Sequence, residues 1–367
     1  MGDPRLERWA RVLVDYATGV RPGDKVAIRG TPAAAPLLRT VYRLVLERGG
    51  HPHLLVSLPG AAEIFYRVAR EPQLTFVSPL DRLVIETFDV LINVLSETNT
   101  RSLSTVDPAK QALVSAARRD LTRTYMERAA RGELRWVLTL YPTEAYAQEA
   151  EMSLQEFEEF VYEAGRLNEE DPVARWQEQA AFQSRLVAWL KGRRRLHIRG
   201  PHADLVLGIE GRTFISADGR HNFPDGEIFT GPEETVTEGW VRFTYPALYG
   251  GREVEGVELV FEGGRVVKAT AKKNEAFLLK MLETDEGARY LGEFAFGTNF
   301  AIRRFTRNLL FDEKLGGTFH LALGAAYPET GGRNQSAIHW DLICDLQEGE
   351  IVADGEVLYR DGRFLVG

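Results

Sequence analysis

A histidine and an aspartate stand two residues apart in the segment SAIHWDLI, at His339 and Asp341. In a β-strand this spacing points both side chains to the same face of the sheet. His320 lies among apolar residues in the segment GTFHLALG, which also has the pattern of a strand. A neutral imidazole and a carboxylate aimed together are a typical pair of metal ligands. The two segments therefore predict a metal site, although either histidine could instead be a core residue with an ordinary hydrogen bond.

Two glutamates upstream bear on this prediction. Glu293 lies within the apolar, glycine-flanked segment YLGEFAFGTN. An ionised carboxylate buried there without a partner would be costly, so we expect it to face a cation. Glu227 lies in the turn-rich segment HNFPDGEIFTGPEE, where a carboxylate is usually only solvated, so Glu227 alone indicates little. Taken with the two histidines and the aspartate, Glu293 favours a shared metal site over unrelated core residues.

The composition of the chain limits which ligands and partners are available. Its 367 residues are 44% apolar and 27% charged, which is typical of a folded globular protein and excludes disordered and collagen-like classes. The net charge of -8 gives no overall attraction to nucleic acid or to anionic lipid, so neither is an expected partner. Cys344 is the one cysteine, which excludes an internal disulfide and a multi-thiolate zinc site. Any metal must be held by histidine, carboxylate or other oxygen ligands.

Several common catalytic motifs are missing from the sequence. No histidine is followed by glutamate, so there is no HExxH zinc helix, and the chain has neither the GK pair of a P-loop nor a GxSxG nucleophile elbow. The first strand-like segment leads into RGTPAAAP rather than a GxGxxG dinucleotide loop. The opening MGDPRLERWARV lacks the apolar core of a signal peptide, and no run of 18 apolar residues occurs. We therefore expect a cytoplasmic protein with no membrane partner.

The first half of the chain alternates helical and strand patterns. Strand-like runs occur at KVAIRG, HPHLLVS, DVLINVLS and RWVLTLYP, and amphipathic helical segments such as APLLRTVYRLVLERGG separate them. Such alternation predicts a mainly parallel sheet covered by helices. Residues 152–190 add one or two helices that lead out of this first domain.

The pattern changes after the basic run within residues 192–195. Short strand-like segments then alternate with glycine turns, and VELVFEGGRVVKA predicts a hairpin because two β-branched runs flank a tight glycine turn. We therefore predict an α/β protein of two domains. Residues 1–191 form an N-terminal α/β domain with a mainly parallel sheet, and residues 192–367 form a C-terminal, β-rich (α+β) domain that carries the metal site.

Four segments of the second half resemble a known family. NFPDGEIFTGP, LGEFAFGTN, LFDEKLGGTFHLALG and SAIHWDLICDL are similar to segments of the aminopeptidase T and aminopeptidase S metallopeptidases, the M29 family. The opening VLVDYATGVRPGDKVAIRG resembles the start of that family, so the resemblance extends over the whole chain and is most specific between residues 221 and 345. Members carry a two-metal site, and the resemblance implies that its ligands here are Glu227, Glu293, His320, Tyr327, His339 and Asp341. Without the resemblance, Tyr327 would be an ordinary loop aromatic.

The resemblance also implies that the protein is a metalloaminopeptidase and that it forms a homodimer. Such a ligand set suits two divalent ions about 3.5 to 4 Å apart, bridged by at least one carboxylate. We expect zinc, with cobalt or manganese able to substitute, because mixed nitrogen and oxygen ligation is weakly selective. The ions would activate a water that attacks the first peptide bond of substrates with a free N-terminus.

Two other functions remain open from the sequence. One is a dipeptidase or another metal-dependent amidohydrolase, and the other is a catalytically silent metal-binding protein. No residue is assigned as the general base. Glu313, Glu233 and Glu234 are weak candidates, because a charged residue in such a segment is more often a solvated surface residue.

Overall fold

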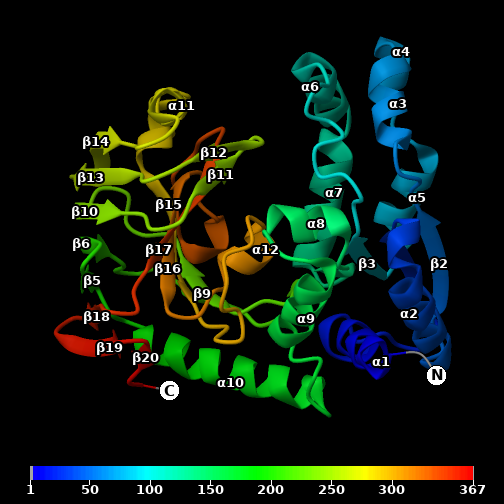
Figure 1. Cartoon of the computed structure of the whole chain (residues 1–367), viewed down its shortest axis with the longest axis horizontal. Helices are drawn as coiled ribbons and strands as arrows, with labels where there is room; N and C mark the ends of the chain where they lie inside the picture. Colours follow the sequence, from blue (N-terminus) through cyan, green and yellow to red (C-terminus); the bar gives the residue numbers. More distant parts are fainter. Residues whose placement is uncertain (1–2, 367) are drawn as a thin grey trace. The chain divides into compact units, whose positions relative to one another are not determined.

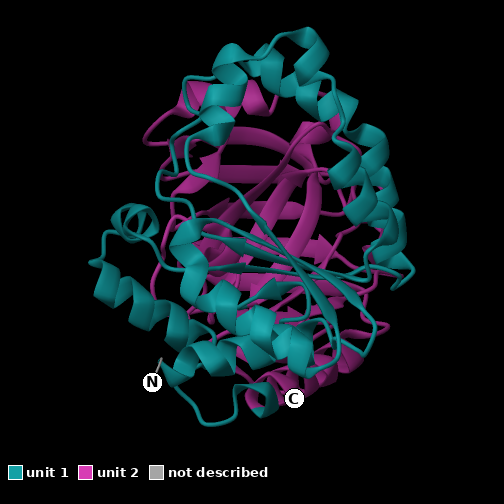
Figure 2. Cartoon of the chain, turned by 90° about the vertical axis from the view of Figure 1, so that its right-hand side faces the viewer, with its two compact units in different colours: residues 1–174, 219–224 teal, residues 175–218, 225–367 magenta. Residues whose placement is uncertain are grey.

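The computed structural model describes residues 3–366 of the chain (Figure 1). They divide into two compact units, coloured separately in Figure 2. Unit 1 comprises residues 1–174 and 219–224, and unit 2 comprises residues 175–218 and 225–367. Unit 1 is built around a parallel sheet and unit 2 is rich in antiparallel strands, which confirms the predicted fold class. The predicted domain limits at residues 191 and 192 stay a prediction.

The sheet of unit 1 has the strand order β2-β1-β3-β4-β8, and all of its neighbouring strands are parallel. Its strands are β1 (Lys25–Gly30), β2 (His51–Val56), β3 (Val90–Leu95), β4 (Arg135–Leu140) and β8 (Asn222–Phe223). The last of these comes from the short return of residues 219–224 to unit 1. The predicted mainly parallel sheet is therefore confirmed.

Helices connect the strands of unit 1, and several begin where the sequence supplies a cap. Asp3 caps the first helix, Asp107 caps α6, and Ser153 forms a capping box with Glu156 at the start of α9. The helices are α1 (Pro4–Arg11), which continues in π-helical turns (Val12–Ala17), α2 (Ala35–Glu47), α3 (Ala61–Val68), α4 (Glu71–Leu74), α5 (Pro79–Thr87), α6 (Pro108–Ala117), α7 (Arg119–Ala130), α8 (Glu144–Glu149) and α9 (Leu154–Ala164).

An apolar core in unit 1 joins helices α5 and α7 to the sheet. Val84 and Ile85 of α5 and Leu121 of α7 are buried together with Leu91 of β3 and Ala27 of β1. Parallel sheets are covered on both faces, so their central strands are nearly all apolar. This packing holds α5 and α7 over strands β1 and β3.

Unit 2 contains two antiparallel sheets and a separate hairpin. One sheet has the order β14-β13-β10-β6-β5-β18-β19-β20, the other has the order β17-β16-β15-β9-β7, and β11 pairs with β12. The predicted hairpin is present, because β13 and β14 pair across a turn at Gly263 and Gly264, which both have positive φ. Helix α10 (Pro172–Leu190) begins in the last residues of unit 1 and continues in unit 2, which also contains α11 (Glu275–Met281) and α12 (Leu309–Asp312).

The strands of unit 2 are short and follow one another closely along the chain. They are β5 (Arg195–Gly200), β6 (Ala203–Gly208), β7 (Ile215–Ala217), β9 (Glu227–Thr230), β10 (Glu238–Arg242), β11 (Ala247–Tyr249), β12 (Arg252–Val254), β13 (Glu258–Glu262), β14 (Arg265–Thr270), β15 (Leu291–Gly297), β16 (Thr318–Gly324), β17 (His339–Asp345), β18 (Glu350–Ala353), β19 (Glu356–Arg360) and β20 (Arg363–Phe364).

One face of the five-stranded sheet packs on a large apolar core. Phe294 and Phe296 of β15, Phe319 and Leu321 of β16, and Trp340 of β17 all belong to it. Side chains alternate between the two faces of a strand, so the residues between these point to the opposite face. The three strands are buried along almost their whole length, which means that the opposite face is also largely covered.

No helix among residues 3–366 is long and apolar enough to cross a membrane.

Candidate metal centre

Three neighbouring strands bring four of the predicted ligands to one face of the sheet. Ala322 of β16 lies opposite Glu293 of β15 on one side and opposite Asp341 of β17 on the other. His320 is two residues from Ala322, and His339 is two residues from Asp341. Because side chains repeat every second residue, all four side chains point away from the apolar core. The two-residue spacing of His339 and Asp341 therefore places both side chains on the same face of the sheet, as the sequence predicts.

Glu227 joins the same face from strand β9. It lies opposite Gly297 of β15, and Phe229, two residues on, lies opposite Ala295. Ala295 is in turn the partner of His320 on the next strand. A slip of the register by one residue would turn these side chains to the other face, so the site depends on this pairing.

A bulge in β15 sets the direction of Glu293. Relative to β16 the strand has one extra residue, Gly292, because Leu291 and Glu293 face consecutive residues of β16. A Cβ atom on Gly292 would lie 2.1 Å from the carbonyl oxygen of Ala325, so a side chain does not fit there. The bulge lets Leu291 join the core while Glu293 points to the opposite face.

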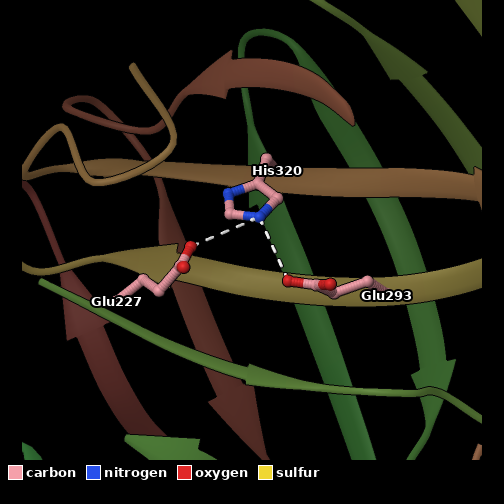
Figure 3. Close-up of side chains that lie close together, drawn as sticks. All are labelled: Glu227, Glu293 and His320. Carbon is pink, nitrogen blue, oxygen red and sulfur yellow. Dashed lines mark hydrogen bonds and ion pairs between the residues drawn. The ribbon is translucent and has the colours of Figure 1, made fainter. Parts of the chain in front are cut away.

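The side chains form two ligand groups that share Glu293. His320 Nε2 lies 3.3 Å from Glu293 Oε1 and 3.5 Å from Glu227 Oε2, as Figure 3 shows. His339 Nε2 lies 3.5 Å from Glu293 Oε2 and 3.6 Å from Asp341 Oδ1. Within each group, the atoms that could bind a metal lie within 4.8 Å of one another. The two oxygens of Glu293 thus face different histidines.

The hydrogen bonding of these side chains fits metal ligation. Glu227 Oε2 is buried and has no hydrogen-bond partner, which is costly for a carboxylate unless a cation satisfies it. His339 Nδ1 lies 2.7 Å from the carbonyl oxygen of Ala325, and because a carbonyl only accepts, Nδ1 carries the proton. In a neutral ring this leaves the Nε2 lone pair directed at the carboxylates, as in other metal-binding histidines.

The carboxylates dominate the charge state of both histidines. Burial opposes the charged form of His320, but the hydrogen bond to Glu293 and the charge of Glu227 outweigh it and raise its pKa to about 9. Burial is likewise outweighed at His339, where Asp341 and Glu293 raise the pKa to about 11. Protons on the imidazoles therefore offset part of the negative charge of the carboxylates when no cation is bound. Divalent ions would replace these protons, because ligation requires neutral imidazoles.

A buried lysine that the sequence patterns do not single out lies beside this centre. Lys314 Nζ is 3.2 Å from Glu227 Oε1, and it also contacts the carboxylate of Glu313. Burial would lower the pKa of Lys314, but the charges of these glutamates raise it well above its ordinary value. The lysine thus holds one oxygen of Glu227 and leaves the other directed at His320. The three consecutive charged residues in LFDEKLGG are the feature of the sequence that could have indicated this lysine, but charged residues beside a glycine turn are usually exposed to solvent.

The three glutamates considered as proton carriers lie in different surroundings. Glu313 is paired with Lys314 beside the centre, and its pKa is raised, chiefly by burial. Glu233 instead accepts a hydrogen bond from the backbone N–H of Glu210. Glu234 is paired with an arginine side chain at 2.7 Å and accepts a second hydrogen bond from a backbone N–H. Among these three, Glu313 is the one that the structure associates with the ligand groups.

Tyr327 lies at the edge of the centre. Its ring centroid is 5.1 Å from that of His339 and 5.8 Å from that of Phe229. Its pKa is raised, first by burial and then by the negative charge of Glu293 and Asp341. The ring therefore packs on a predicted ligand, and the ligation of a metal by its oxygen stays a prediction.

The whole chain matches a model of one protein family, described as thermophilic metalloprotease (M29), over residues 2–364. The chain belongs to the M29 peptidase family. It is 27% identical to aminopeptidase 2 of Geobacillus stearothermophilus, over 99% of this chain and 98% of that protein. It is 31% identical to aminopeptidase T of Thermus thermophilus, over 73% of this chain and 72% of that protein. The resemblance drawn from the sequence and the predicted class of peptidase are confirmed, and family membership implies a divalent metal.

Solved structures extend the comparison to the fold. Wild-type AmpT from Thermus thermophilus superimposes with a TM-score of 0.84 at 25% identity, over 99% of both chains. A 2,5-dihydroxypyridine dioxygenase from Pseudomonas putida has a TM-score of 0.61 at 13% identity, over 100% of this chain and 98% of that one. The second likeness concerns the fold alone, because one fold can carry unrelated reactions.

Proposed function

We propose that this M29 protein is an aminopeptidase that removes the N-terminal amino acid from peptides with a free N-terminus, using a water activated by two divalent ions. The position of Glu293 carries the proposal, because its two oxygens face His320 and His339 from the middle of two ligand groups. A carboxylate shared in this way is suited to bridge two ions. The relatives named as aminopeptidases support the choice of reaction.

The proposed ligands fall into two sets that share Glu293. Glu227 and His320 complete the first set, and His339 and Asp341 complete the second. The donors are nitrogen and oxygen atoms without a thiolate, so we assign zinc and expect cobalt or manganese to substitute. Tyr327 is proposed as a further oxygen ligand beside His339.

The residues around the centre have separate tasks in this proposal. When bound, the ions would lower the pKa of a shared water towards neutrality and polarise the scissile carbonyl. Lys314 fixes Glu227 through Oε1, and the carbonyl of Ala325 fixes the ring of His339 through Nδ1. Glu313 is the candidate for carrying a proton to the leaving amine, because it is a partly buried carboxylate beside the centre that belongs to neither ligand group.

A homodimer formed through unit 1 is the second part of the proposal. Strand β2 is at the edge of its sheet and exposes Leu54, Leu55 and Val56, and helix α3 exposes Ile64 and Phe65. An exposed apolar edge strand is a template for pairing with another chain, so a second copy that covers it would remove an aggregation hazard. Sedimentation equilibrium should show a dimer that Leu55→Glu weakens; a monomeric wild-type protein would refute this part.

The test of the reaction combines activity with metal content. The protein is assayed for release of p-nitroaniline from leucine p-nitroanilide, before EDTA, after EDTA, and after the return of zinc, cobalt or manganese. We expect activity to be lost and restored, with about two metal equivalents per chain in the active protein by mass spectrometry. Activity that survives complete metal removal would overturn the proposal.

Peptide substrates separate the proposed reaction from its alternatives. Peptides of two residues and of several residues are compared, each with a free and with an acetylated N-terminus. An aminopeptidase cleaves both lengths and requires the free amine. Cleavage restricted to dipeptides would indicate a dipeptidase, and bound metal without turnover of any substrate would indicate a metal-binding protein without catalysis.

A further inference from the structure

The sheet of unit 1 changes direction at strand β1. The chain passes from β1 to β2 on one side, and then crosses to β3 on the other side of β1. In open parallel sheets such a switch leaves a crevice at the carboxyl ends of the two diverging strands, and ligands bind there in many unrelated proteins. The residues of the metal centre belong to the other unit, so none of them forms part of this crevice.

Strands β1 and β3 become polar as they approach this crevice. Ala27 and Leu91 are register partners and belong to the apolar core under α5 and α7. Two residues further on, the same face presents Arg29 and Asn93, which are also register partners. Central parallel strands are normally apolar throughout, so an arginine and an asparagine side by side at this point call for a polar partner.

A cavity of about 290 Å³ lies over these two residues. Its apolar part is formed by Ile85, Leu91 and Leu121, and its polar part includes Arg29 and Asn93 with residues of α5 and α7. Ligand cavities in proteins commonly begin near 300 Å³, combine an apolar lining with a few polar groups, and favour such switch points. The size and the lining therefore suit a small molecule with an apolar body.

Three polar groups of the cavity have no acceptor in the protein. Within residues 3–366, the guanidinium of Arg29, the amide of Asn93 and the hydroxyl of Tyr125 make no hydrogen bond to the protein, although all three line the same cavity. Arg29 reaches the carboxylate of Asp81 only at 3.9 Å, which is beyond hydrogen-bond distance. Burial raises the pKa of Tyr125 to about 12, so its hydroxyl remains a neutral donor.

The charges of the cavity favour an anion with a single charge. Arg118 is 3.3 Å from Asp81, so that carboxylate already has one cation, and Arg29 supplies a second. Two guanidinium groups against one carboxylate leave one net positive charge in the cavity. A guanidinium binds a carboxylate through two parallel hydrogen bonds. A monocarboxylate therefore matches both the charge and the geometry better than a dianionic phosphate.

We propose that the cavity between strands β1 and β3 and helices α5 and α7 binds a small monocarboxylate with an apolar body. Arg29 and Asn93 hold the carboxylate, and the leucines and the isoleucine of the cavity cover the apolar body. This binding is independent of the proposed peptidase reaction.

The experiment uses 3-phenylpropionate as the probe and titrates it into the full-length, metal-loaded protein by calorimetry. Its neutral analogue, 3-phenylpropionamide, has nearly the same shape and lacks the charge. We expect saturable binding of the acid, with the amide and inorganic phosphate each at least about tenfold weaker, because a charge-assisted pair is lost with the first and the apolar contacts with the second. No saturable binding of the acid, or equal binding of the amide or the phosphate, would overturn the proposal.

Variants locate the binding. Arg29→Gln should weaken the acid at least about tenfold. Arg82→Gln is the matched control, because Arg82 is an exposed arginine of α5 that pairs with Glu86 outside the cavity. Glu293→Gln disturbs the metal centre and should leave binding unchanged. Loss of binding in Glu293→Gln but not in Arg29→Gln would place the acid at the metal centre and refute the site.

A second substitution guards against a folding defect in Arg29→Gln. Thr122 lines the cavity from the exposed surface of α7, so Thr122→Phe fills the space and leaves the charges in place. We expect it to abolish binding while the circular dichroism spectrum and the melting temperature remain those of the wild type. Undiminished binding in a folded Thr122→Phe protein would also contradict the proposal.

Discussion

In the parallel sheet of unit 1, strand β3 is buried along its first half and becomes polar at Asn93, near its carboxyl end. In unit 2, by contrast, the buried strands β15 and β16 carry the polar residues Glu293 and His320 in their interiors. Parallel strands all end at one edge of a sheet, so their polar residues gather where the strands stop. In an antiparallel sheet, alternate residues of neighbouring strands form rows across one face. A functional site can then lie in the middle of the sheet, provided that something balances its charge.

The two sheets also differ in the free-energy cost of burying their polar residues. A polar group at the end of a strand can reach water, but a carboxylate in the interior of a buried strand needs a cation or a proton. We therefore expect unit 2 to depend on its metal and its lysine far more than unit 1 depends on any charged residue.

The largest effect should come from Glu293, the carboxylate shared by both ligand groups. Glu293→Gln should lose metal and lower kcat/KM by at least about 100-fold, since even residues that only orient metal ligands cost 10- to 100-fold. Glu262→Gln, at an exposed position of β13, is the matched control. Metal content and leucine p-nitroanilide hydrolysis are measured together. An active Glu293→Gln enzyme that still binds metal would contradict the expectation that unit 2 depends on Glu293 and its metal far more than unit 1 depends on any charged residue.

Metal removal should come next, as an effect on stability. The ions bind the folded chain and not the unfolded one, so at a free concentration of about 100 times Kd they add roughly 2.7 kcal/mol to the free energy of unfolding. EDTA should therefore lower the melting temperature of the wild type in scanning calorimetry. In Glu293→Gln, EDTA should change it little. An equal effect of EDTA on both proteins would assign the stabilisation to a different site.

Lys314→Met should have an intermediate effect. It removes the cation that holds Glu227 Oε1, so we expect metal affinity to fall about 10- to 100-fold. Lys280→Met, on the exposed side of α11, is the control. Calorimetric titration of zinc into the metal-free proteins measures this directly. Unchanged affinity would show that Glu227 is oriented without the lysine.

The smallest effect concerns Asp312, a buried carboxylate of unit 2 outside both ligand groups. Its Oδ1 accepts hydrogen bonds from the backbone N–H and the hydroxyl of Thr306, and its Oδ2 has no partner. Burial raises its pKa to about 7, so the folded state holds the proton more tightly than the unfolded state. Stability should therefore fall as pH rises from about 4 to 7, by up to about 1.4 kcal/mol per pH unit.

Asp312→Asn should remove this part of the pH dependence, because the amide keeps an acceptor for Thr306 and cannot ionise. Urea unfolding of wild type and variant at pH 5 and pH 8 measures it. The variant should gain stability relative to the wild type at pH 8. If the free energy of unfolding changed equally between pH 5 and pH 8 in both proteins, Asp312 would not be the cause of the pH dependence.

The alternation of residues along β15, β16 and β17 could be predicted from the sequence, because it is a local property of strands. Spacing alone places His339 and Asp341 on one face. Which residues are neighbours across strands could not be predicted, since the pairing of Ala322 with Glu293 depends on the bulge at Gly292 and on tertiary packing.

Other features depend on packing that a sequence does not display. Lys314 lies between a glutamate and a glycine turn, where a charge is normally solvated, yet the fold buries it. Arg29 and Asn93 each interrupt a short apolar run only once, and their pairing appears when β1 and β3 are aligned. The strand β8 has two residues, which is too short to give a pattern of its own.

The extra residue at Gly292 also constrains the ways in which this gene can change over time. Exchanging one side chain for another leaves the length of β15 intact, so such changes can accumulate on its core face. Loss or gain of a residue between Glu293 and Gly297 would reverse the orientation of Glu293 relative to Glu227, and a larger residue in place of Gly292 would collide with Ala325. An insertion or deletion within this part of β15 should therefore disrupt the site, whereas one in a loop leaves the register of the strand intact.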